Sequence, residues 1–295
     1  MKNEILLPNG RRAIVKSVSF FDSGNIEMVT LSAKETFLVS LPNTKMVKPA
    51  ELGFDENGDI NFVKLQKDDI VIIDIPNSNG KKVRTTEVGF NKNRNFTHFK
   101  LLHGEKIEIE LPNKVNVKIT EITYYNTGEI KDVSVLYGEY YLINNEKVKI
   151  TRVSFYITGK IEKLYFASGE SITLNKHVVF PREIEYYENG EIKSILLEDG
   201  YNFSLVLPIT NEKIKVSYLL FYPSMDIKEI IPLPGEIVTL PDNKQLEVSN
   251  LLLDEYGNIE EAKLFTGETK RFVDEIRQNI KEQISKEIDI DSNGE

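Results

Sequence analysis

Residues 186–192 read Tyr-Tyr-Glu-Asn-Gly-Glu-Ile, and variants of this stretch occur eight times along the 295-residue chain. In each copy an aromatic residue or a leucine precedes a short turn, and an isoleucine or phenylalanine follows it. The turn position is glycine in six copies and is occupied by Arg94 and Met225 in the other two. Successive turn positions lie 31–36 residues apart, so the chain is a tandem repeat whose period must be explained before any single residue.

The residues on either side of the turn predict a β-hairpin in every copy. In the fourth copy Ile122 and Tyr124 precede the turn and alternate with more polar residues, as in a strand with one buried face. The turn glycine supplies the positive φ that a tight hairpin requires. After the turn Ile130, Val133 and Val135 break the alternation once. This break predicts a β-bulge that brings all three side chains to one face.

A second turn, usually Gly-Glu, leads in most copies to a short third strand such as residues 107–111 or 172–174. Leu-Pro or Ile-Pro often closes this strand, as expected for a residue that cannot donate to a β-ladder. The predicted fold is therefore all-β, with eight tandem antiparallel β-meander repeats of about 33 residues that stack on one another. We expect an open repeat array, and a closed, eight-bladed propeller-like ring is the alternative.

Three segments follow from this pattern. Residues 1–272 form the predicted β-repeat domain, residues 273–288 a short C-terminal helix, and residues 289–295 an acidic tail. The helix is predicted from one narrow apolar stripe, formed by Val273, Ile276, Ile280, Ile284 and Ile288. We expect it to cap the end of the array, and a homodimer formed through the same stripe is the alternative.

The tail carries a partial resemblance to a calcium site. Asp289, Asp291 and Asn293 are spaced like the first oxygen ligands of an EF-hand loop. The glutamate that such a loop carries at its twelfth position is missing, because the sequence stops at Glu295. We therefore expect a weak half-site at best, and no metal centre.

Composition narrows the classes of partner. The chain has 37 basic and 46 acidic residues and a formal net charge of −9, which opposes binding to nucleic acid. It has no cysteine, so disulfides and thiolate metal sites are excluded. No apolar run is long enough to span a bilayer, so no transmembrane segment is expected. The expected location is the cytoplasm, with export or envelope association as the alternative if a signal has been removed.

No catalytic motif stands out. His98, His103 and His177 are isolated from one another and are expected to be surface histidines. The chain has neither a Gly-x-Ser-x-Gly elbow nor a phosphate-binding glycine loop. The turn glutamates recur once per copy, whereas catalytic carboxylates would be expected at one site. We therefore predict that the protein is not an enzyme and needs no cofactor.

The best functional candidate is a column of aromatic residues directly after the inward-facing aromatic of each hairpin. Alternation along a strand points this column to the opposite face. Its members are Phe21, Tyr125, Tyr156, Tyr187 and Tyr222, and Asp55, Asn91 and Asp254 interrupt it. An exposed row of such rings would bind a protein partner or a glycan, so a non-catalytic scaffold is predicted. The alternative is a structural or envelope-associated, self-assembling repeat protein whose tyrosines are buried by stacking.

The hairpin sequences also resemble a known family. FFDSGNIE at 20–27, FDENGDIN at 54–61, YYNTGEIK at 124–131, YITGKIEK at 156–163 and YYENGEIKS at 186–194 are similar to the hairpins of bacterial MORN-variant repeats of the toxin–antitoxin antidote type. The resemblance covers roughly ten residues per copy and implies a β-repeat scaffold for interactions. The family's period is shorter, and its Gly-x-Trp segment is absent here because the chain has no tryptophan. An antitoxin role therefore stays open and does not follow from the resemblance.

Overall fold

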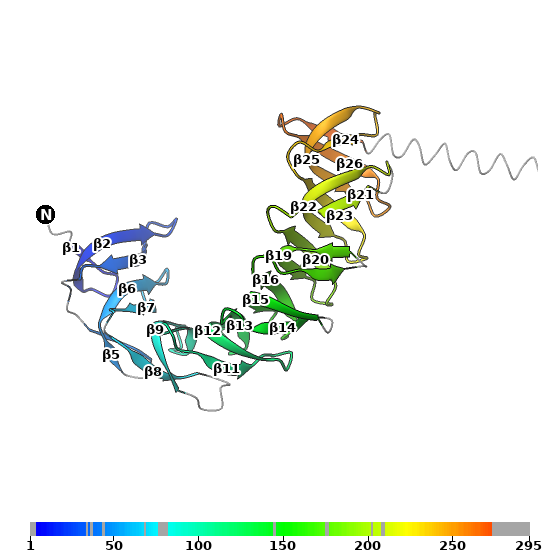
Figure 1. Cartoon of the computed structure of the whole chain (residues 1–295). Coiled ribbons are helices and arrows are strands. Elements are labelled where there is room, and N and C mark those ends of the chain that lie inside the picture. Colours follow the sequence, from blue (N-terminus) through cyan, green and yellow to red (C-terminus); the bar gives the residue numbers. More distant parts are fainter. Residues whose placement is uncertain are drawn as a thin grey trace, which may run out of the picture. The chain divides into compact units, whose positions relative to one another are not determined.

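The structure is a computed structural model. It describes residues 4–272 except 34, 36–37, 43–44, 68, 76–81, 144–145, 175–176, 202 and 208–209. The predicted helix at 273–288 and the tail with Asp289, Asp291 and Asn293 lie outside these residues. The predicted fold class is confirmed for the part that is described: the chain is all-β and antiparallel, and its largest sheet has 23 strands and is not closed into a barrel (Figure 1).

Each copy contributes a first strand, a second strand of six residues and a short third strand. The first strands are β2 (Arg12–Phe20), β6 (Pro49–Phe54), β9 (Lys82–Phe90), β12 (Asn116–Tyr124), β15 (Glu146–Phe155), β19 (Pro181–Tyr186), β22 (Lys213–Phe221) and β25 (Gln245–Leu253). The second strands are β3 (Ile26–Leu31), β7 (Ile60–Leu65), β10 (Phe96–Leu101), β13 (Ile130–Val135), β16 (Ile161–Phe166), β20 (Ile192–Leu197), β23 (Ile227–Pro232) and β26 (Ile259–Leu264).

The third strands are β4 (Val39–Ser40), β8 (Val71–Asp74), β11 (Ile107–Glu110), β14 (Tyr140–Ile143), β17 (Ile172–Leu174), β21 (Phe203–Val206), β24 (Ile237–Thr239) and β27 (Thr269–Arg271). Three further short strands are β1 (Glu4–Leu6), β5 (Met46–Val47) and β18 (His177–Val179). The strands β5 and β18 are the separated first halves of long strands. In both cases the second half begins at a proline, Pro49 or Pro181, because proline cannot donate to the ladder.

Hydrogen bonding links each copy to the next in two ways. A second strand pairs with its own first strand and with the first strand of the next copy, as β10 does with β9 and β12. The third strand pairs with the N-terminal half of the next first strand, as β11 does with β12. In the last copy β27 turns back and pairs with β26 instead. Neighbouring copies are therefore interleaved and share their strands.

The predicted bulge is present. In the fourth copy Thr123 lies opposite Asp132 and Tyr124 lies opposite Ile130, so Lys131 is the extra residue. The register shifts at the corresponding place in each of the seven first-to-second-strand pairings that the structure describes. The shift returns Ile130 and Val133 to the buried face of the sheet, where they are 5% and 0% exposed.

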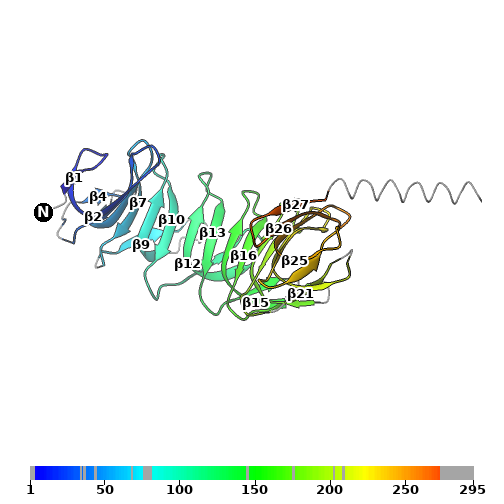
Figure 2. The same ribbon diagram turned by 90° about the horizontal axis from the view of Figure 1, so that it is seen from above.

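The chain divides into two compact units, and each is described by itself. Unit 1 comprises Met1–Ile143 and Lys149–Ile161, and unit 2 comprises Asn144–Val148 and Glu162–Glu295. In unit 1 the hairpins from β2–β3 to β12–β13 follow one another side by side (Figures 1 and 2). In both units the predicted inward columns form the core, as Ile122 and Phe155 do in unit 1 and Leu251 does in unit 2.

The first copy departs from this pattern at Phe20. Its counterparts Phe54, Phe90 and Phe155 are at most 2% exposed, whereas Phe20 is 59% exposed. Among the described residues no second strand precedes β2, so the C-terminal half of β2 is paired on one side alone. No helix in the described part of the chain has the length and apolar character needed to cross a membrane.

Candidate functional surface

The predicted aromatic column connects successive copies. Tyr125 donates its hydroxyl to the Phe155 carbonyl of the next copy at 2.7 Å. Tyr187 and Tyr222 do the same, to the carbonyls of Phe221 at 2.7 Å and Leu253 at 2.9 Å. In each case the acceptor belongs to the inward residue of the following hairpin. The tyrosine is thus an inter-copy hydrogen-bond donor, a role that the strand period alone did not reveal.

The rings of this column are only partly open to solvent. Phe21, Tyr125, Tyr156, Tyr187 and Tyr222 are all half-buried. Lys131, the bulge residue of the fourth copy, places its ammonium 5.6 Å from the centre of the Tyr125 ring, and Lys228 does the same to Tyr222 at 5.4 Å. These contacts are short enough for a favourable cation–π interaction. The structure therefore places Tyr125, Tyr187 and Tyr222 on the seams between copies.

The column is interrupted where its position holds Asp or Asn. The Asp55 carboxylate accepts the backbone N–H groups of Asn57 and Asp59, at 3.0 and 2.9 Å. Asn91 and Asp254 bond the N–H groups of their own turns in the same way. A short polar side chain thus stabilises its own turn, whereas tyrosine reaches the next copy.

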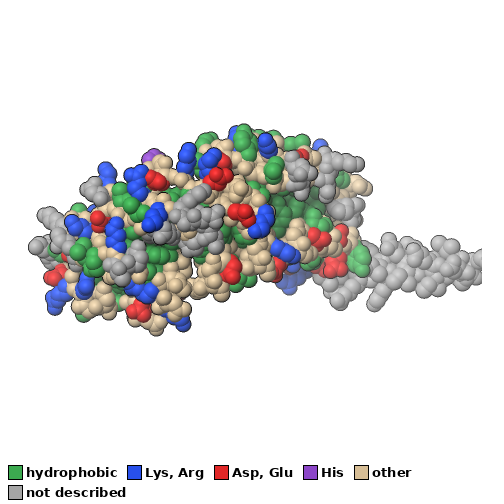
Figure 3. Space-filling model, turned by 90° about the horizontal axis from the view of Figure 1, so that it is seen from below, with side chains coloured by type: hydrophobic (Ala, Val, Ile, Leu, Met, Phe, Trp, Pro, Cys, Tyr) green, Lys and Arg blue, Asp and Glu red, His purple; other side chains and the backbone are tan. Residues whose placement is uncertain are grey.

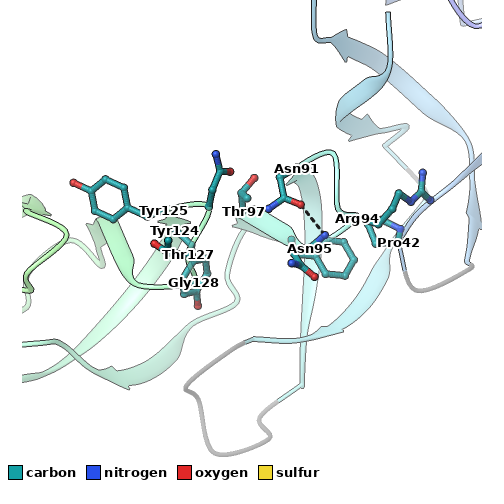
Figure 4. A pocket seen from close by; sticks show the side chains of 11 residues that line it. Pro42, Asn91, Arg94, Asn95, Thr97, Tyr124, Tyr125, Thr127 and Gly128 are labelled. Carbon is teal, nitrogen blue, oxygen red and sulfur yellow. Dashed lines mark hydrogen bonds between the residues drawn. The ribbon is translucent and has the colours of Figure 1, made fainter. Parts of the chain in front are cut away.

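Two hollows in unit 1 occur at this interruption. One has a volume of about 450 Å³ and lies between the turns of the third and fourth copies (Figure 4). The other has a volume of about 480 Å³ and lies between the turns of the second and third copies. Both are lined by Asn91, Thr97 and Asn126. They lie where Asp55 and Asn91 replace the tyrosine that bridges neighbouring turns elsewhere.

Asparagine side chains recur in the lining of these hollows, together with aromatic rings. Five asparagines line them: Asn61, Asn91, Asn93, Asn95 and Asn126. Figure 4 shows Asn91 bonded to Asn95 and Tyr125 beside Thr127 at the edge of the first hollow. Phe62 adds an aromatic ring to the second. Amides offer both donors and acceptors, so the surface suits a ligand rich in hydroxyl groups.

Arg94 explains part of the irregularity in the third copy. It occupies the turn-glycine position with φ 62°, in the left-handed region that costs a non-glycine residue about 1–2 kcal/mol. Its guanidinium donates to the Ser40 carbonyl at 3.0 Å and lies 5.3 Å from the centre of the Phe90 ring. Arg94 therefore joins the third copy to the first and closes one side of the first hollow.

His98 lies next to the second hollow on the outward face of the sheet. Its ring lies 6.2 Å from that of Phe62, and its Nδ1 is 3.1 Å from the Thr123 hydroxyl. Burial lowers the pKa of His98, and this effect outweighs the opposing influence of Glu121 and Glu87. The side chain is a partly covered surface histidine, paired with a neighbouring hydroxyl.

The recurrent turn glutamates have a structural explanation. Glu105 bonds the Arg84 side chain, Glu139 bonds Lys118 at 2.9 Å, and Glu236 accepts the Lys215 N–H at 3.0 Å. Each glutamate thus binds the same position on the first strand of its own copy. In the sixth copy the pair is replaced by Tyr201 stacked on Phe180, with ring centres 4.0 Å apart. The repeated glutamates belong to the scaffold.

The chemistry of the wider surface is mixed. On the face shown in Figure 3, Lys and Arg side chains lie among Asp and Glu side chains, so neither sign of charge forms a large area of its own there. In the described residues, no group of three or more His, Asp or Glu side chains is arranged to hold a metal ion. The half-site at Asp289, Asp291 and Asn293 lies outside those residues.

Comparison with known proteins adds no family to these observations. No protein-family model matches the chain, and no curated protein matches it. The similarity of its hairpins to MORN-variant repeats therefore stays a resemblance.

Proposed function

We propose that this protein is a non-catalytic repeat scaffold that binds a neutral glycan in the hollows between its second, third and fourth hairpin turns. The observation that carries the proposal is the coincidence of the two hollows with the interruption of the tyrosine column. Tyr125, Tyr187 and Tyr222 each bridge to the next copy through their hydroxyl groups. Where Asp55 and Asn91 stand instead, amides and hydroxyls line an open surface.

The lining favours a glycan over a charged ligand. The amides of Asn61, Asn93 and Asn126 make no side-chain hydrogen bond within the described residues, so they are available to a ligand's hydroxyl groups. Phe62 offers a ring for the apolar face of a sugar. Three charged residues line the hollows: Asp55 has its carboxylate engaged in its own turn, Arg94 bonds Ser40, and Lys92 lies on the turn beside the second hollow.

A glycan array with neutral and anionic oligosaccharides tests the proposal directly. We expect binding to neutral glycans, and we expect the double substitution Asn61→Ala with Asn126→Ala to weaken it about tenfold, from two lost hydrogen bonds of ~0.5–1.5 kcal/mol each. Asn189→Ala is the matched control, because Asn189 is a turn asparagine in the sixth copy, away from the hollows. Equal binding by the double variant and by the control would refute the proposal, as would an array without any neutral ligand.

The structural alternative has one observation in its favour. A self-assembling or envelope-associated repeat protein would use its tyrosines for stacking, and Tyr125, Tyr187 and Tyr222 donate their hydroxyls between copies. Light scattering across a concentration series separates the two proposals. Growth in mass with concentration supports assembly, whereas a constant mass together with glycan binding supports the scaffold.

A further inference from the structure

The first hairpin leaves open a strand edge that is covered in the later hairpins. In each later copy, the C-terminal half of the first strand pairs with the second strand of the preceding copy. In the first copy this half is residues 17–20 of β2, and among the described residues it pairs with β3 alone (Figure 1). The short strand β1 pairs with the other half of β2, from Arg12 to Ile14. Residues 17–20 therefore form the open edge of the sheet in unit 1.

Core side chains at the open edge lack the cover that their counterparts have. At each of the seven seams, an apolar residue of a second strand lies opposite an apolar residue of the next first strand, and both are at most 4% exposed. These pairs are Val29–Leu52, Val63–Val88, Phe99–Ile122, Val133–Val153, Leu164–Ile184, Ile195–Leu219 and Ile230–Leu251. Val18 holds the same place in the first copy, but it is only half-buried, and Phe20 is 59% exposed. A strand beside Val18 would cover both side chains.

The backbone groups of the open edge are also turned outward. The N–H and the carbonyl of Phe21 both bond within its own hairpin. Alternation along the strand therefore turns the N–H and carbonyl groups of Val18 and Phe20 away from β3. In later copies the carbonyl equivalent to that of Phe20 accepts a tyrosine hydroxyl, as the Phe155 carbonyl does from Tyr125. Residues 17–20 contain neither a charge nor a proline, the residues that protect many natural edges from pairing.

We propose that the open edge binds an extended segment of a partner protein, which adds to the sheet as an antiparallel strand in the place of a preceding second strand. The seven seams define the chemistry of this segment. It carries an apolar residue opposite Val18, because that place is apolar at each seam. The residue opposite Ser17 is uncharged, since Ser17 lacks the carboxylate with which Glu87 and Glu121 face a lysine of the preceding copy.

The chain's own strands are poorly suited to fill this place in a second molecule. The second strands β3, β7, β10, β13, β20, β23 and β26 are paired on both edges. In an antiparallel pair of two β2 strands centred on Val18, the turn after Phe20 of one molecule would lie beside residues 12–14 of the other. Those residues already pair with β1. A separate segment that leaves the sheet after a few residues avoids both obstacles.

The fourth copy supplies a probe peptide. Residues 125–136 contain the tyrosine that bonds the next copy and the strand β13 that pairs with β15. Ser134 follows the central Val133, so an uncharged residue would lie opposite Ser17. Alternation turns the N–H of Val133 toward β15 and that of Ser134 toward β12. Proline at either position thus removes one N–H, but from opposite edges of the peptide.

Fluorescence anisotropy with the labelled peptide and the full chain tests the proposal. We expect saturable binding, weakened about tenfold or more by Val133→Pro in the peptide, which removes the N–H that faces the open edge. The matched control, Ser134→Pro, should leave binding nearly unchanged. Tyr125→Phe in the peptide should weaken binding roughly fivefold, through the lost bond to the Phe20 carbonyl. Val18→Pro in the protein should abolish it. Absence of binding, or equal losses for the two proline peptides, would overturn the proposal.

Hydrogen exchange in the unaltered protein keeps the test decisive if Val18→Pro fails to fold. Saturating peptide should slow exchange of the Val18 and Phe20 N–H groups about tenfold or more. It should leave Ser19 unchanged, because the Ser19 N–H already faces β3. Unchanged exchange at Val18 and Phe20 would contradict the proposal. A dimer of the full chain that Phe20→Asp converts to a monomer would also refute it, by assigning the open edge to a second copy.

Discussion

Replacing Tyr125 with phenylalanine removes one hydroxyl and leaves the ring in place. The hydroxyl donates to the Phe155 carbonyl across the seam between the fourth and fifth copies. A hydrogen bond of this kind contributes a net ~0.5–1.5 kcal/mol to stability. We therefore expect Tyr125→Phe to lower the free energy of opening this seam by about 1 kcal/mol, which speeds local exchange roughly fivefold.

Native-state hydrogen exchange is the suitable measurement, because copies contact mainly their neighbours and the loss should stay local. Faster exchange is expected in peptides from β12, β13 and β15, with little change in unit 2. Tyr125→Ala also removes the half-buried ring and its contact with Lys131, so its effect should be about twofold to threefold larger in free energy. Phe21 occupies the same column and has no hydroxyl. Exchange in the peptides around Phe21 therefore serves as the control for a copy without this hydrogen bond.

Two exchange results would contradict this prediction, and they can be told apart. Unchanged exchange in Tyr125→Phe would mean that the hydroxyl contributes nothing to the seam. A uniform increase in the exchange rate across all of unit 1 would mean that the unit opens as a whole and that the Tyr125 hydrogen bond does not stabilise its seam locally. In either case the assignment of the aromatic column to the scaffold would have to be withdrawn.

Three further changes follow from the geometry. Gly53→Ala should cost about 1–3 kcal/mol, because its new Cβ would lie 2.9 Å from the Phe62 Cβ; thermal melts measure this, and Ser19→Ala at the corresponding position should stay within about 0.5 kcal/mol. Met225→Gly should stabilise unit 2 by roughly 0.5–1 kcal/mol, since Met225 holds φ 72°, and an unchanged urea midpoint would count against strain at that turn. The pKa of His98 is lowered on folding, so stability should fall as the pH drops through the unfolded value of 6.5 and level off below the folded value. His98→Gln should remove that part of the pH dependence. The prediction would be wrong if, between pH values of about 7.5 and 5.5, the urea midpoint of the wild type fell no further than that of the variant.

The sequence predicted the hairpins because each column has one physical cause. Glycine at the turn, apolar residues on one face and the extra residue at Lys131 all follow from strand geometry, and the structure confirms each of them. The partner of the third strand could not be predicted in this way. The pattern of β11 shows which of its side chains are buried, but nothing in it says that its hydrogen bonds go to β12 of the next copy.

The same limit applies to the candidate site. Alternation predicted Tyr125 on the face opposite Tyr124, and Tyr125 is half-buried where Tyr124 is buried, but the pattern could not show that the hydroxyl reaches Phe155. In the sequence, Asp55 and Asn91 are visible only as two positions that interrupt the aromatic column. Only the structure shows that hollows lie there. A useful signal was available: Asp and Asn in the first position of a turn favour bonds to their own backbone.

The sharing of strands between copies bears on how the protein unfolds. A third strand such as β11 belongs to one copy along the chain but forms its hydrogen bonds with the first strand of the next copy, β12, whereas β27 of the last copy pairs within its own copy. A stretch of one period length such as the third copy does not contain all of its own partners, so one copy cut out of the chain would lack part of its ladder. Coupling between neighbours should therefore exceed the intrinsic stability of any one copy. Within each unit, melting should be a steep cooperative transition in place of a gradual fraying from one end.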